Sequence, residues 1–346
     1  AKFVFLRIED TDGARRWLRE KLPNITHSDQ KPGKTALNVG FTYLGLKRMG
    51  LGRAVHSFPR EFREGMSNVG RAQQLGDIEN SSPDSWQVAG WESREAHILL
   101  MIYGESKAAT DAAYKGLVEG YLRSVFTHIY VQDAARHPEM REPFGFRDGL
   151  SQPAIEGIDH KAQEGQNLIK LGEFLLGYPD EYGYVPPSPE IPAYFDRDSM
   201  FPFLKDPSKK DFGRNGTYVV WRKLAQDVQG FDCFLKTQAE KTMDSEESLA
   251  AKIMGRKRDG EPLVPPDERG IKEKKERDYN SFRYSKDRKG NQCPITAHIR
   301  RANPRDSGGK ASKRLLADRH RIIRRGMPFK DHDEEGLLCI AINADN

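Results

Sequence analysis

The sequence predicts an α+β protein made of two modules, and three observations support this prediction. The chain has 346 residues, which is more than one ordinary core and matches two domains of ~100–200 residues each. Residues 3–132 contain alternating strand and helix patterns without a repeat of fixed period. A proline-rich stretch at 175–207, which disfavours regular structure, separates these patterns from a second set.

Apolar spacing predicts each element of the first module. Apolar runs of strand length predict strands, and amphipathic or alanine-rich stretches predict helices. Trp17 and Leu18 are the expected buried residues of the first helix. The strands are expected at 3–8, 36–42, 97–103 and 126–132, and the helices at 12–22 and 106–122. This order, β-α-β followed by β-α-β, is the ferredoxin-like arrangement.

The second module is expected after the proline-rich stretch. Residues 216–224 (GTYVVWRKL) predict a strand, an amphipathic stretch begins at Phe231, and a helix is expected near 245–254. The strongly charged residues 256–289 are expected to form an insertion or long loop. The last strands are expected at 321–329 and 336–343. The predicted domains are therefore 1–175, a connection at 176–212, and 213–346.

Composition excludes several classes of protein. The longest apolar runs, such as residues 337–342, are far shorter than the ~18 residues of a transmembrane helix, so no membrane span is expected. No secretion signal is visible, which favours a cytoplasmic location, with secretion as the alternative if a leader has been removed. The spacing of Cys233, Cys293 and Cys339 matches neither a zinc pair nor a disulfide framework, so reduced thiols are expected.

The positive charge of the chain is local. The formal net charge is +5, but residues 298–325 contain ten Lys and Arg against two Asp, so the rest of the chain carries −3. Such a cluster is compatible with a nucleic-acid interface, a site for an anionic ligand or a solvated face. No RNP-type sequence, zinc finger or recognition helix is evident, which disfavours nucleic acid as a partner.

Three segments contain the candidate chemistry, and one of them, residues 322–329 (IIRRGMPF), predicts a strand stopped by Gly and Pro, the alternative being a strand whose arginines face solvent. In residues 143–153 (PFGFRDGLSQP), glycines on both sides of Asp148 predict an exposed carboxylate on a tight turn, the alternative being an ordinary Asp-Gly turn. Residues 297–305 (AHIRRANPR) contain His298, and no second His or Cys stands at a zinc-ligand spacing. A single His suffices for haem iron, because the porphyrin supplies the equatorial nitrogens. The alternative is a structural or surface histidine.

Five segments, taken in order, resemble the dye-decolourising peroxidase family and in particular its larger members. They are GFRDGLSQPAIEG, EFLLGY, CPITAHIRRANPR, HRIIRRGMPF and GLLCIAI. The similarity extends from about residue 37 to residue 342 and is weakest in the charged insertion. It implies two ferredoxin-like modules with antiparallel sheets and haem b between them.

The resemblance implies roles for three residues. His298 matches the axial iron ligand, Asp148 the distal acid and base, and Arg324 the arginine that stabilises charge on the peroxide. The implied function is a haem peroxidase that reduces hydrogen peroxide and oxidises phenolic, dye-like or other aromatic reductants. The alternative is a haem-binding or iron-handling protein without significant turnover, which would not require Asp148 and Arg324.

Further cofactor contacts are also implied. Arg300 and Arg305 are expected to pair with the haem propionates, the alternative being backbone or surface groups. Gly149 and Leu338 are the other expected contacts. Cys339 stands near a position where the family usually has Phe, so a roomier pocket is expected.

Bulky reductants would have to be oxidised at the protein surface. Tyr218, Trp221 and Tyr284 are candidate electron relays by residue type, although the interpretation as core aromatics is favoured. Neither the natural reductant nor the oligomeric state follows from the sequence.

Overall fold

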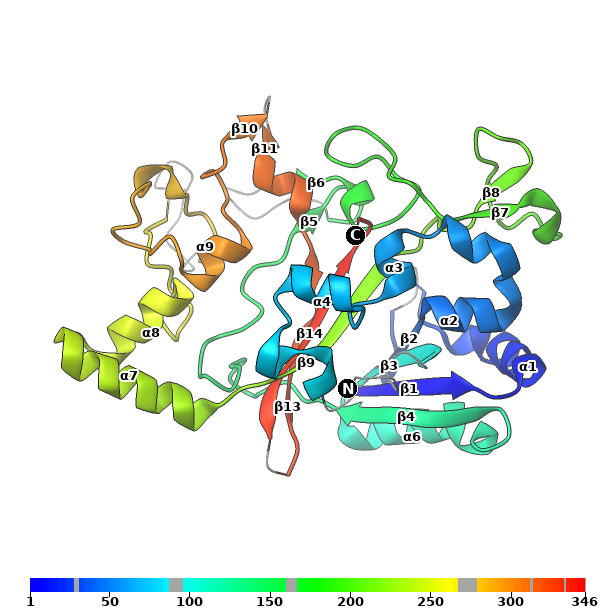
Figure 1. The fold of residues 1–346 in the computed structure, drawn as a ribbon, viewed down its shortest axis with the longest axis horizontal. Helices are drawn as coiled ribbons and strands as arrows, with labels where there is room; N and C mark the ends of the chain where they lie inside the picture. Colours follow the sequence, from blue (N-terminus) through cyan, green and yellow to red (C-terminus); the bar gives the residue numbers. More distant parts are fainter. Residues whose placement is uncertain are drawn as a thin grey trace. The chain divides into compact units, whose positions relative to one another are not determined.

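Two units make up the computed structural model, which describes residues 1–27, 31–86, 96–159, 167–266, 279–311, 314–332 and 334–345 (Figure 1). The first unit comprises residues 1–134 and 188–213, and the second comprises residues 135–187 and 214–345. The predicted boundaries at 175 and 212 differ from this division. The loop that contains Asp148 belongs to the second unit, and residues 188–213 belong to the first.

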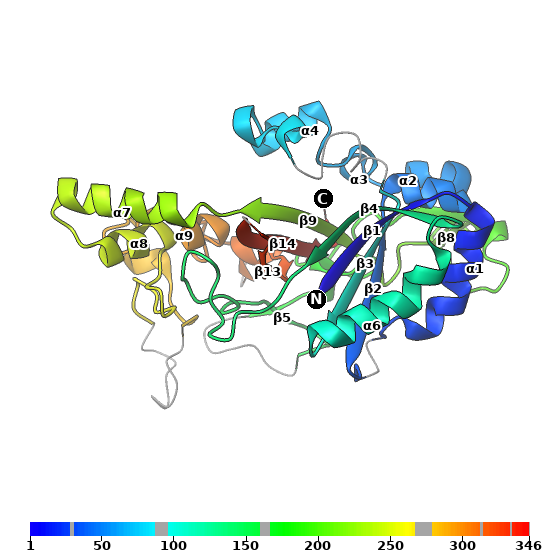
Figure 2. The same cartoon turned by 90° about the horizontal axis from the view of Figure 1, so that it is seen from below.

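The first unit is built on a four-stranded antiparallel sheet of order β2-β3-β1-β4 (Figures 1 and 2). Its strands are β1 (Lys2–Ile8), β2 (Thr35–Phe41), β3 (Ile98–Gly104) and β4 (Phe126–Asp133). Helix α1 (Thr11–Lys21) follows β1, and helix α6 (Lys107–Val118) follows β3. This order is that of the ferredoxin-like fold, so the prediction for this module is confirmed.

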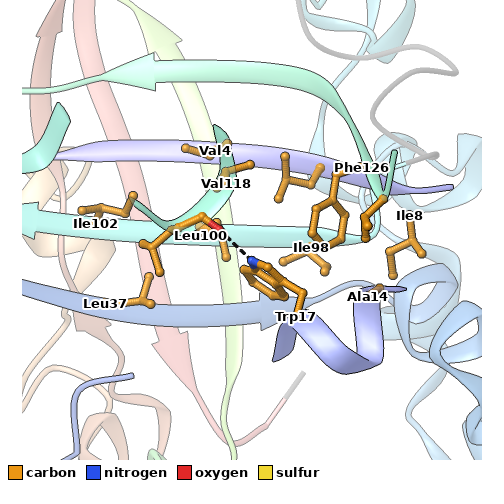
Figure 3. Packing of buried hydrophobic residues seen from close by; sticks show 13 residues of the cluster. Val4, Ile8, Ala14, Trp17, Leu37, Ile98, Leu100, Ile102, Val118 and Phe126 are labelled. Atoms are coloured by element: carbon orange, nitrogen blue, oxygen red, sulfur yellow. Dashed lines mark hydrogen bonds between the residues drawn. The ribbon is translucent and has the colours of Figure 1, made fainter. Parts of the chain in front are cut away.

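Helices α1 and α6 pack on one face of this sheet. Alternate residues of β1, namely Val4, Leu6 and Ile8, lie in a core that also contains Trp17 of α1 (Figure 3). Trp17 is fully buried, as predicted, and its indole Nε1 donates a 2.7 Å hydrogen bond to the carbonyl of Leu117. Since Leu117 belongs to α6, this bond joins the two helices.

Side-chain caps explain where the two helices begin. The Asp10 carboxylate accepts the N–H of Asp12 at the start of α1. The Ser106 hydroxyl accepts the N–H of Ala109 at the start of α6. Both caps satisfy N–H groups that have no partner inside the helix.

The remaining elements of the first unit are short. Between β2 and β3 lie α2 (Tyr43–Leu46), η2 (Lys47–Leu51), η3 (Gly52–Ser57), α3 (Arg60–Glu64), α4 (Val69–Leu75), η4 (Glu79–Ser81) and η5 (Pro83–Ser85). Two others, η1 (Leu22–Asn24) and η6 (Glu119–Tyr121), follow the packed helices. Within the proline-rich stretch, β7 (Glu190–Pro192) leads into η8 (Ala193–Phe195) and pairs with β8 (Lys209–Asp211). Most of residues 175–207 is irregular, as predicted.

The second unit contains a sheet whose central strand is β14 (Glu335–Asn343). This strand pairs antiparallel with β9 (Tyr218–Ala225), and its other edge pairs with β12 (Ile323–Arg324) and β13 (Met327–Lys330). Helices α7 (Val228–Thr242) and α8 (Glu246–Met254) follow β9, so the α+β class is confirmed here too. The strand predicted at 321–329 is instead two strands, which are interrupted at residues 325–326.

The loops of the second unit contain further short elements. They are β5 (Ala154–Ile155), β6 (Leu168–Ile169), η7 (Leu171–Glu173), η9 (Tyr284–Lys286), α9 (His298–Ala302), β10 (Lys310–Ala311), β11 (Arg314–Leu315) and η10 (Leu316–His320). Part of the predicted charged insertion, residues 267–278, lies outside the described residues. None of the helices in the described parts is long and apolar enough to cross a membrane.

Replacement of Trp17 tests the core of the first unit. Trp17→Ala should lower the free energy of unfolding by about 3–5 kcal/mol, because it removes a fully buried ring and leaves a cavity. Equilibrium denaturation measured by circular dichroism checks this value. The control is Leu22→Ala, at a residue that is 50% exposed, which should change the free energy of unfolding by less than about 0.5 kcal/mol. Equal effects of the two substitutions would contradict this packing.

Glu173 has a buried carboxyl group, and its backbone carbonyl binds the residue that follows β14 in the second unit. The Glu173 side chain accepts the N–H of Glu181, and its carbonyl accepts the N–H of Ala344. Burial, together with the smaller effect of the charges of Asp180, Glu181 and Asp345, raises the pKa of Glu173 to about 7 against the opposing effect of the Glu181 N–H. The native state therefore holds a proton that the unfolded chain releases at lower pH.

This pKa predicts a loss of stability as pH rises. Below pH 4.5 the Glu173 carboxyl group is protonated in both the native and the unfolded chain, and its contribution to the free energy of unfolding is complete. This contribution is lost as pH rises through about 7. The loss is at most about 3 kcal/mol. Unfolding of Glu173→Gln should therefore depend less on pH between 5 and 7.5 than unfolding of the parent chain. The control, Glu240→Gln at an exposed position on α7, should retain the parental pH dependence; identical profiles for all three chains would refute the assignment.

Candidate active site

Glu142 organises the loop that contains Asp148. Its two carboxylate oxygens accept the N–H groups of Phe144 at 3.0 Å and Phe146 at 2.8 Å. The amide of Gln226, which follows β9, donates to the same carboxylate at 2.6 Å. The loop is therefore folded around a carboxylate that is itself anchored beside the central sheet of the second unit.

Asp148 lies half-buried in this loop. Its N–H donates to the carbonyl of Met140 at 2.7 Å, and its Oδ1 accepts the N–H of Gly149 at 2.7 Å. Gly149 has a φ of +74°, a conformation that other residues adopt only with strain. Within the described residues no hydrogen bond is made to Oδ2, so this oxygen is available to exchange a proton.

Arg324 is connected to the same loop by three hydrogen bonds. Its guanidinium Nη2 donates to the carbonyl of Ser151 at 2.9 Å. The Gln152 amide accepts the N–H of Arg324 at 3.2 Å and donates to its carbonyl at 2.5 Å. These partners are three and four residues beyond Asp148, so Arg324 is attached to the loop that contains the predicted acid–base residue.

His298 is the first residue of α9 and is exposed to solvent. Desolvation of the imidazole by the surrounding protein lowers the pKa of His298. The positive charge of Arg324 lowers this pKa further, and the negative charge of Glu142 opposes both effects. These charges are thus close enough to His298 to influence its ring. The shift favours the neutral imidazole, which is the form that binds a metal. Among the described residues no hydrogen bond fixes this ring.

Arg300 has a structural role that corrects the expectation of a propionate contact. The residue is only 6% exposed, and its guanidinium donates to the carboxylate of Asp287 at 3.1 Å and to the carbonyls of Asp287 and Cys293. It also lies over the Tyr284 ring at 4.5 Å from the centroid. The guanidinium is therefore engaged inside the protein, which agrees with the backbone pairing considered as the alternative.

Arg305 is only partly engaged. Its Nη1 donates to the carbonyls of Asn280 at 2.7 Å and Phe282 at 3.1 Å, and the guanidinium lies over the Phe282 ring at 3.7 Å. Burial lowers the pKa of Arg305 to about 10. Within the described residues its Nη2 makes no hydrogen bond, so Arg305 keeps donors for an anion.

Leu338 does not lie on the face of the sheet that Arg324 occupies. In the antiparallel ladder Arg324 pairs with Ala341, and directly opposed residues point to the same face. Since side chains alternate along a strand, Cys339 shares that face whereas Leu338 points to the opposite one and is completely buried. The predicted contact at Leu338 is therefore not supported by the side to which its side chain points.

Cys339 of β14 lies among the charges of two arginines, one of which is Arg324 of the candidate site. Burial raises the pKa of its thiol, and the positive charges of Arg222 and Arg324 oppose that rise. Arg222 pairs with Cys339 across β9 and β14, so both side chains lie on one face. The register thus places Cys339 on the face of the sheet that Arg324 occupies, and the roomier pocket expected there stays a prediction.

The candidate electron relays are mainly core aromatics. Tyr284 is completely buried and packs edge-on against Phe282, with ring centroids 5.4 Å apart. Tyr218 is 6% exposed, and burial raises the pKa of its hydroxyl. Trp221 lies half-buried on β9. The interpretation as core residues therefore agrees with the structure for both tyrosines.

Two residues of this region were not singled out from the sequence. Arg321 precedes β12 and lowers the pKa of Arg305 through its charge, and the hydroxyl of Ser281 is buried without a hydrogen-bond partner among the described residues. Arg321 belongs to the basic cluster, which was the only available signal. Ser281 stands in the charged insertion, where its burial could not be predicted.

The donor set fits haem. His298 offers an accessible imidazole, and Arg305, Arg321 and Arg324 are cations whose charges influence one another. The buried hydroxyl of Ser281 lacks a partner within the described residues. An iron ligand together with an excess of cations matches a metalloporphyrin with two carboxylates.

Comparisons with known proteins identify a matching family model and solved structures with a similar fold. Residues 1–138 match the family model described as the DyP dimeric alpha+beta barrel domain. Two solved structures are similar over 99% of this chain and 77% of theirs. They are a fungal DyP-type peroxidase from Auricularia auricula-judae, with a TM-score of 0.74 and 23% identity, and a dye-decolorizing peroxidase in complex with 2,6-dimethoxyphenol, with a TM-score of 0.75 and 21% identity.

The curated relatives have related sequences but longer chains. The chain is 29% identical to dye-decolorizing peroxidase msp1 of Mycetinis scorodonius, over 85% of this chain and 53% of that protein. It is 30% identical to multifunctional dye peroxidase DyP2 of an Amycolatopsis species, over 59% of this chain and 43% of that protein. The chain thus spans about half the length of these relatives.

The fold is therefore that of the DyP-type peroxidases. The match of residues 1–138 to a DyP domain and the similarity to dye-decolorizing peroxidases agree with the resemblance found in the motifs.

Proposed function

We propose that this chain is a haem peroxidase that reduces hydrogen peroxide and oxidises phenolic, dye-like or other aromatic reductants. The observation that carries the proposal is the connection of Arg324 to Ser151 and Gln152, which holds it beside the loop of Asp148. The names of the relatives, among them a peroxidase complexed with 2,6-dimethoxyphenol, support the substrate class.

Haem b is the proposed cofactor, and it would supply the iron at which peroxide is bound and reduced. His298 would bind that iron through its neutral imidazole, which the lowered pKa favours. Arg305 would hold a propionate with the donors that the carbonyls of Asn280 and Phe282 leave unused.

Asp148 would transfer protons, and Arg324 would stabilise negative charge on the peroxide. Hydrogen peroxide must lose a proton from its inner oxygen and gain one on its outer oxygen before water can leave. Oδ2 of Asp148 would accept the first proton and return it, directly or through one water. The guanidinium of Arg324 would stabilise the negative charge that develops on the peroxide as its O–O bond breaks.

Replacement of the carboxylate tests the proposal directly. In the haem-loaded chain, Asp148→Asn should slow peroxide consumption about 10²- to 10⁴-fold, because an amide cannot accept the proton. The Soret absorbance should persist, since the amide oxygen can still accept the N–H of Gly149. Stopped-flow spectroscopy after mixing with peroxide measures the rate.

The matched control is Glu139→Gln, which changes an exposed carboxylate in the preceding turn and should leave the rate unchanged. An unaltered rate in Asp148→Asn would contradict the role of Asp148. A parent chain that binds haem but does not consume peroxide would support the alternative, a haem-binding or iron-handling protein.

The axial ligand has its own test. His298→Ala should weaken haem binding markedly and shift the Soret band of any haem retained, because the iron loses its only protein ligand in the proposal. Absorbance titration of the chain with hemin measures both effects. His320→Ala, at an exposed histidine in η10, should bind hemin like the parent; equal affinity in the His298 variant would remove His298 as the ligand.

A further inference from the structure

Tyr114 of α6 and His128 of β4 form a phenol–imidazole pair in the first unit. The hydroxyl of Tyr114 lies 2.8 Å from Nε2 of His128, and the two rings are stacked with their centroids 5.8 Å apart. Both side chains are half-buried. A phenol in this position has a base that can take its proton within one hydrogen bond.

The register of the sheet explains why the two side chains meet. His128 is paired with Leu6 of β1, and directly opposed residues of an antiparallel pair point to the same face. Leu6 lies in the core between the sheet and its helices, so His128 points toward the helices as well. Tyr114 packs against the same core from α6. The pair is therefore held by a strand and a helix rather than by a loop.

The surroundings keep both groups of the pair neutral. Burial lowers the pKa of His128, so its imidazole is unprotonated at neutral pH and can accept a proton. Burial raises the pKa of Tyr114, the charge of Lys2 opposes this rise, and the charge of Glu119 adds to it. The phenol therefore keeps its proton until it loses an electron. A phenol that has lost an electron is a strong acid, so the proton then leaves with the electron.

The ionic groups beside Tyr114 balance one another. Nζ of Lys2 lies 5.6 Å from the centroid of the Tyr114 ring. This ammonium group forms ion pairs of 3.1 Å with Asp111 and 2.6 Å with Asp133. Lys107 binds the same two carboxylates at 3.3 and 2.8 Å. Because two cations face two anions, no uncompensated positive charge of this network opposes the loss of an electron from Tyr114.

Other tyrosine hydroxyls of the chain lie in different surroundings. The hydroxyl of Tyr284 is buried without a hydrogen-bond partner among the described residues, so no base there takes its proton. Tyr178 donates to the side chain of Asn215 at 2.6 Å, but an amide is not a base. Tyr121 donates to the carboxylate of Glu20 at 2.6 Å, and a carboxylate is a weaker base than an imidazole.

We propose that Tyr114 and His128 form a redox site of the first unit, at which Tyr114 gives an electron to the phenoxyl radical of a phenolic compound while its hydroxyl proton passes to Nε2 of His128. The O–H bond of Tyr114 breaks and an N–H bond of His128 forms. Tyr114 is oxidised to a neutral phenoxyl radical, His128 becomes an imidazolium, and the phenolic radical is reduced to a phenolate. A phenol with a weaker O–H bond reverses the step by returning an electron to Tyr114, and the imidazolium returns the proton.

The inference rests on the proposed function only for the source of the radicals, because one-electron oxidation of a phenolic reductant yields a phenoxyl radical. The Tyr114–His128 pair itself requires no haem. Since both side chains are half-buried, a phenolic radical can approach the ring from the solvent and water can hydrate the imidazolium.

The experiment oxidises the full chain before haem is added. Flash-generated tris(bipyridine)ruthenium(III) serves as the one-electron oxidant, and the transient absorbance of the tyrosyl radical gives the rate. A nitroso spin trap followed by peptide mass spectrometry locates the radical among the 12 tyrosines of the chain. The trapped radical should lie on Tyr114, and Tyr114→Phe should abolish the labelling of that peptide.

Removal of the base tests the role of His128. His128→Ala should slow the oxidation of Tyr114 about 10²-fold, because the proton loses its acceptor. Imidazole added to the solution should restore part of the rate, which it would not do if His128 only supported the fold. The matched control is Tyr121→Phe, which removes the hydroxyl bound to Glu20 and should change neither the rate nor the location of the radical.

The outcomes distinguish this inference from the proposed function. Equal labelling of Tyr114 and Tyr121 in the parent chain would overturn the redox site, because the imidazole would then give no advantage. An unchanged rate in His128→Ala, or a slower rate that imidazole does not restore, would remove His128 as the proton acceptor. None of these results would affect the peroxidase proposal, since no haem takes part. A haem-loaded chain that does not consume peroxide would overturn the proposed function, whereas labelling of Tyr114 in the haem-free chain would still support the pair.

Discussion

The hydrogen bonds between the Gln152 side chain and the backbone of Arg324 hold the candidate site together. A side-chain amide has an acceptor oxygen and a donor NH₂ group next to each other. Gln152 therefore pairs with the backbone N–H and carbonyl of Arg324 in β12 as a residue of a neighbouring strand would. The Asp148 loop is thereby attached to the central sheet of the second unit. Without this attachment, an irregular segment with two positive-φ glycines would have no fixed position relative to Arg324.

The arginines of the second unit differ in how many of their hydrogen bonds other protein groups accept. Buried arginines are costly unless their donors are satisfied. Arg300 meets this requirement through Asp287 and two carbonyls, whereas Arg321 has no partner in the described part of the chain. Arginines of one basic cluster thus differ in whether described groups of the protein accept their hydrogen bonds.

Much of the fold and part of the site could be predicted from the sequence. Asp148, Arg324 and His298 stand in short local motifs, and the structure attaches Arg324 to Ser151 in the loop of Asp148, while the charge of Arg324 acts on His298. That Leu338 and Arg324 lie on opposite faces could not be predicted, because the face on which a strand residue lies depends on its register with β9 and β12. Burial of Arg300 depends likewise on contacts with distant residues.

The sequence alone determined the α+β class, the ferredoxin-like order of the first module and the residue types of the site, because apolar periodicity and short motifs are local properties of the chain. Tertiary structure decided which residues became available to a ligand. Hydrogen bonds and burial between segments far apart in sequence engage Arg300, leave the Ser281 hydroxyl without a partner among the described residues and assign residues 135–187 to the second unit. Such pairings arise only when the chain folds, since each partner is supplied by another segment.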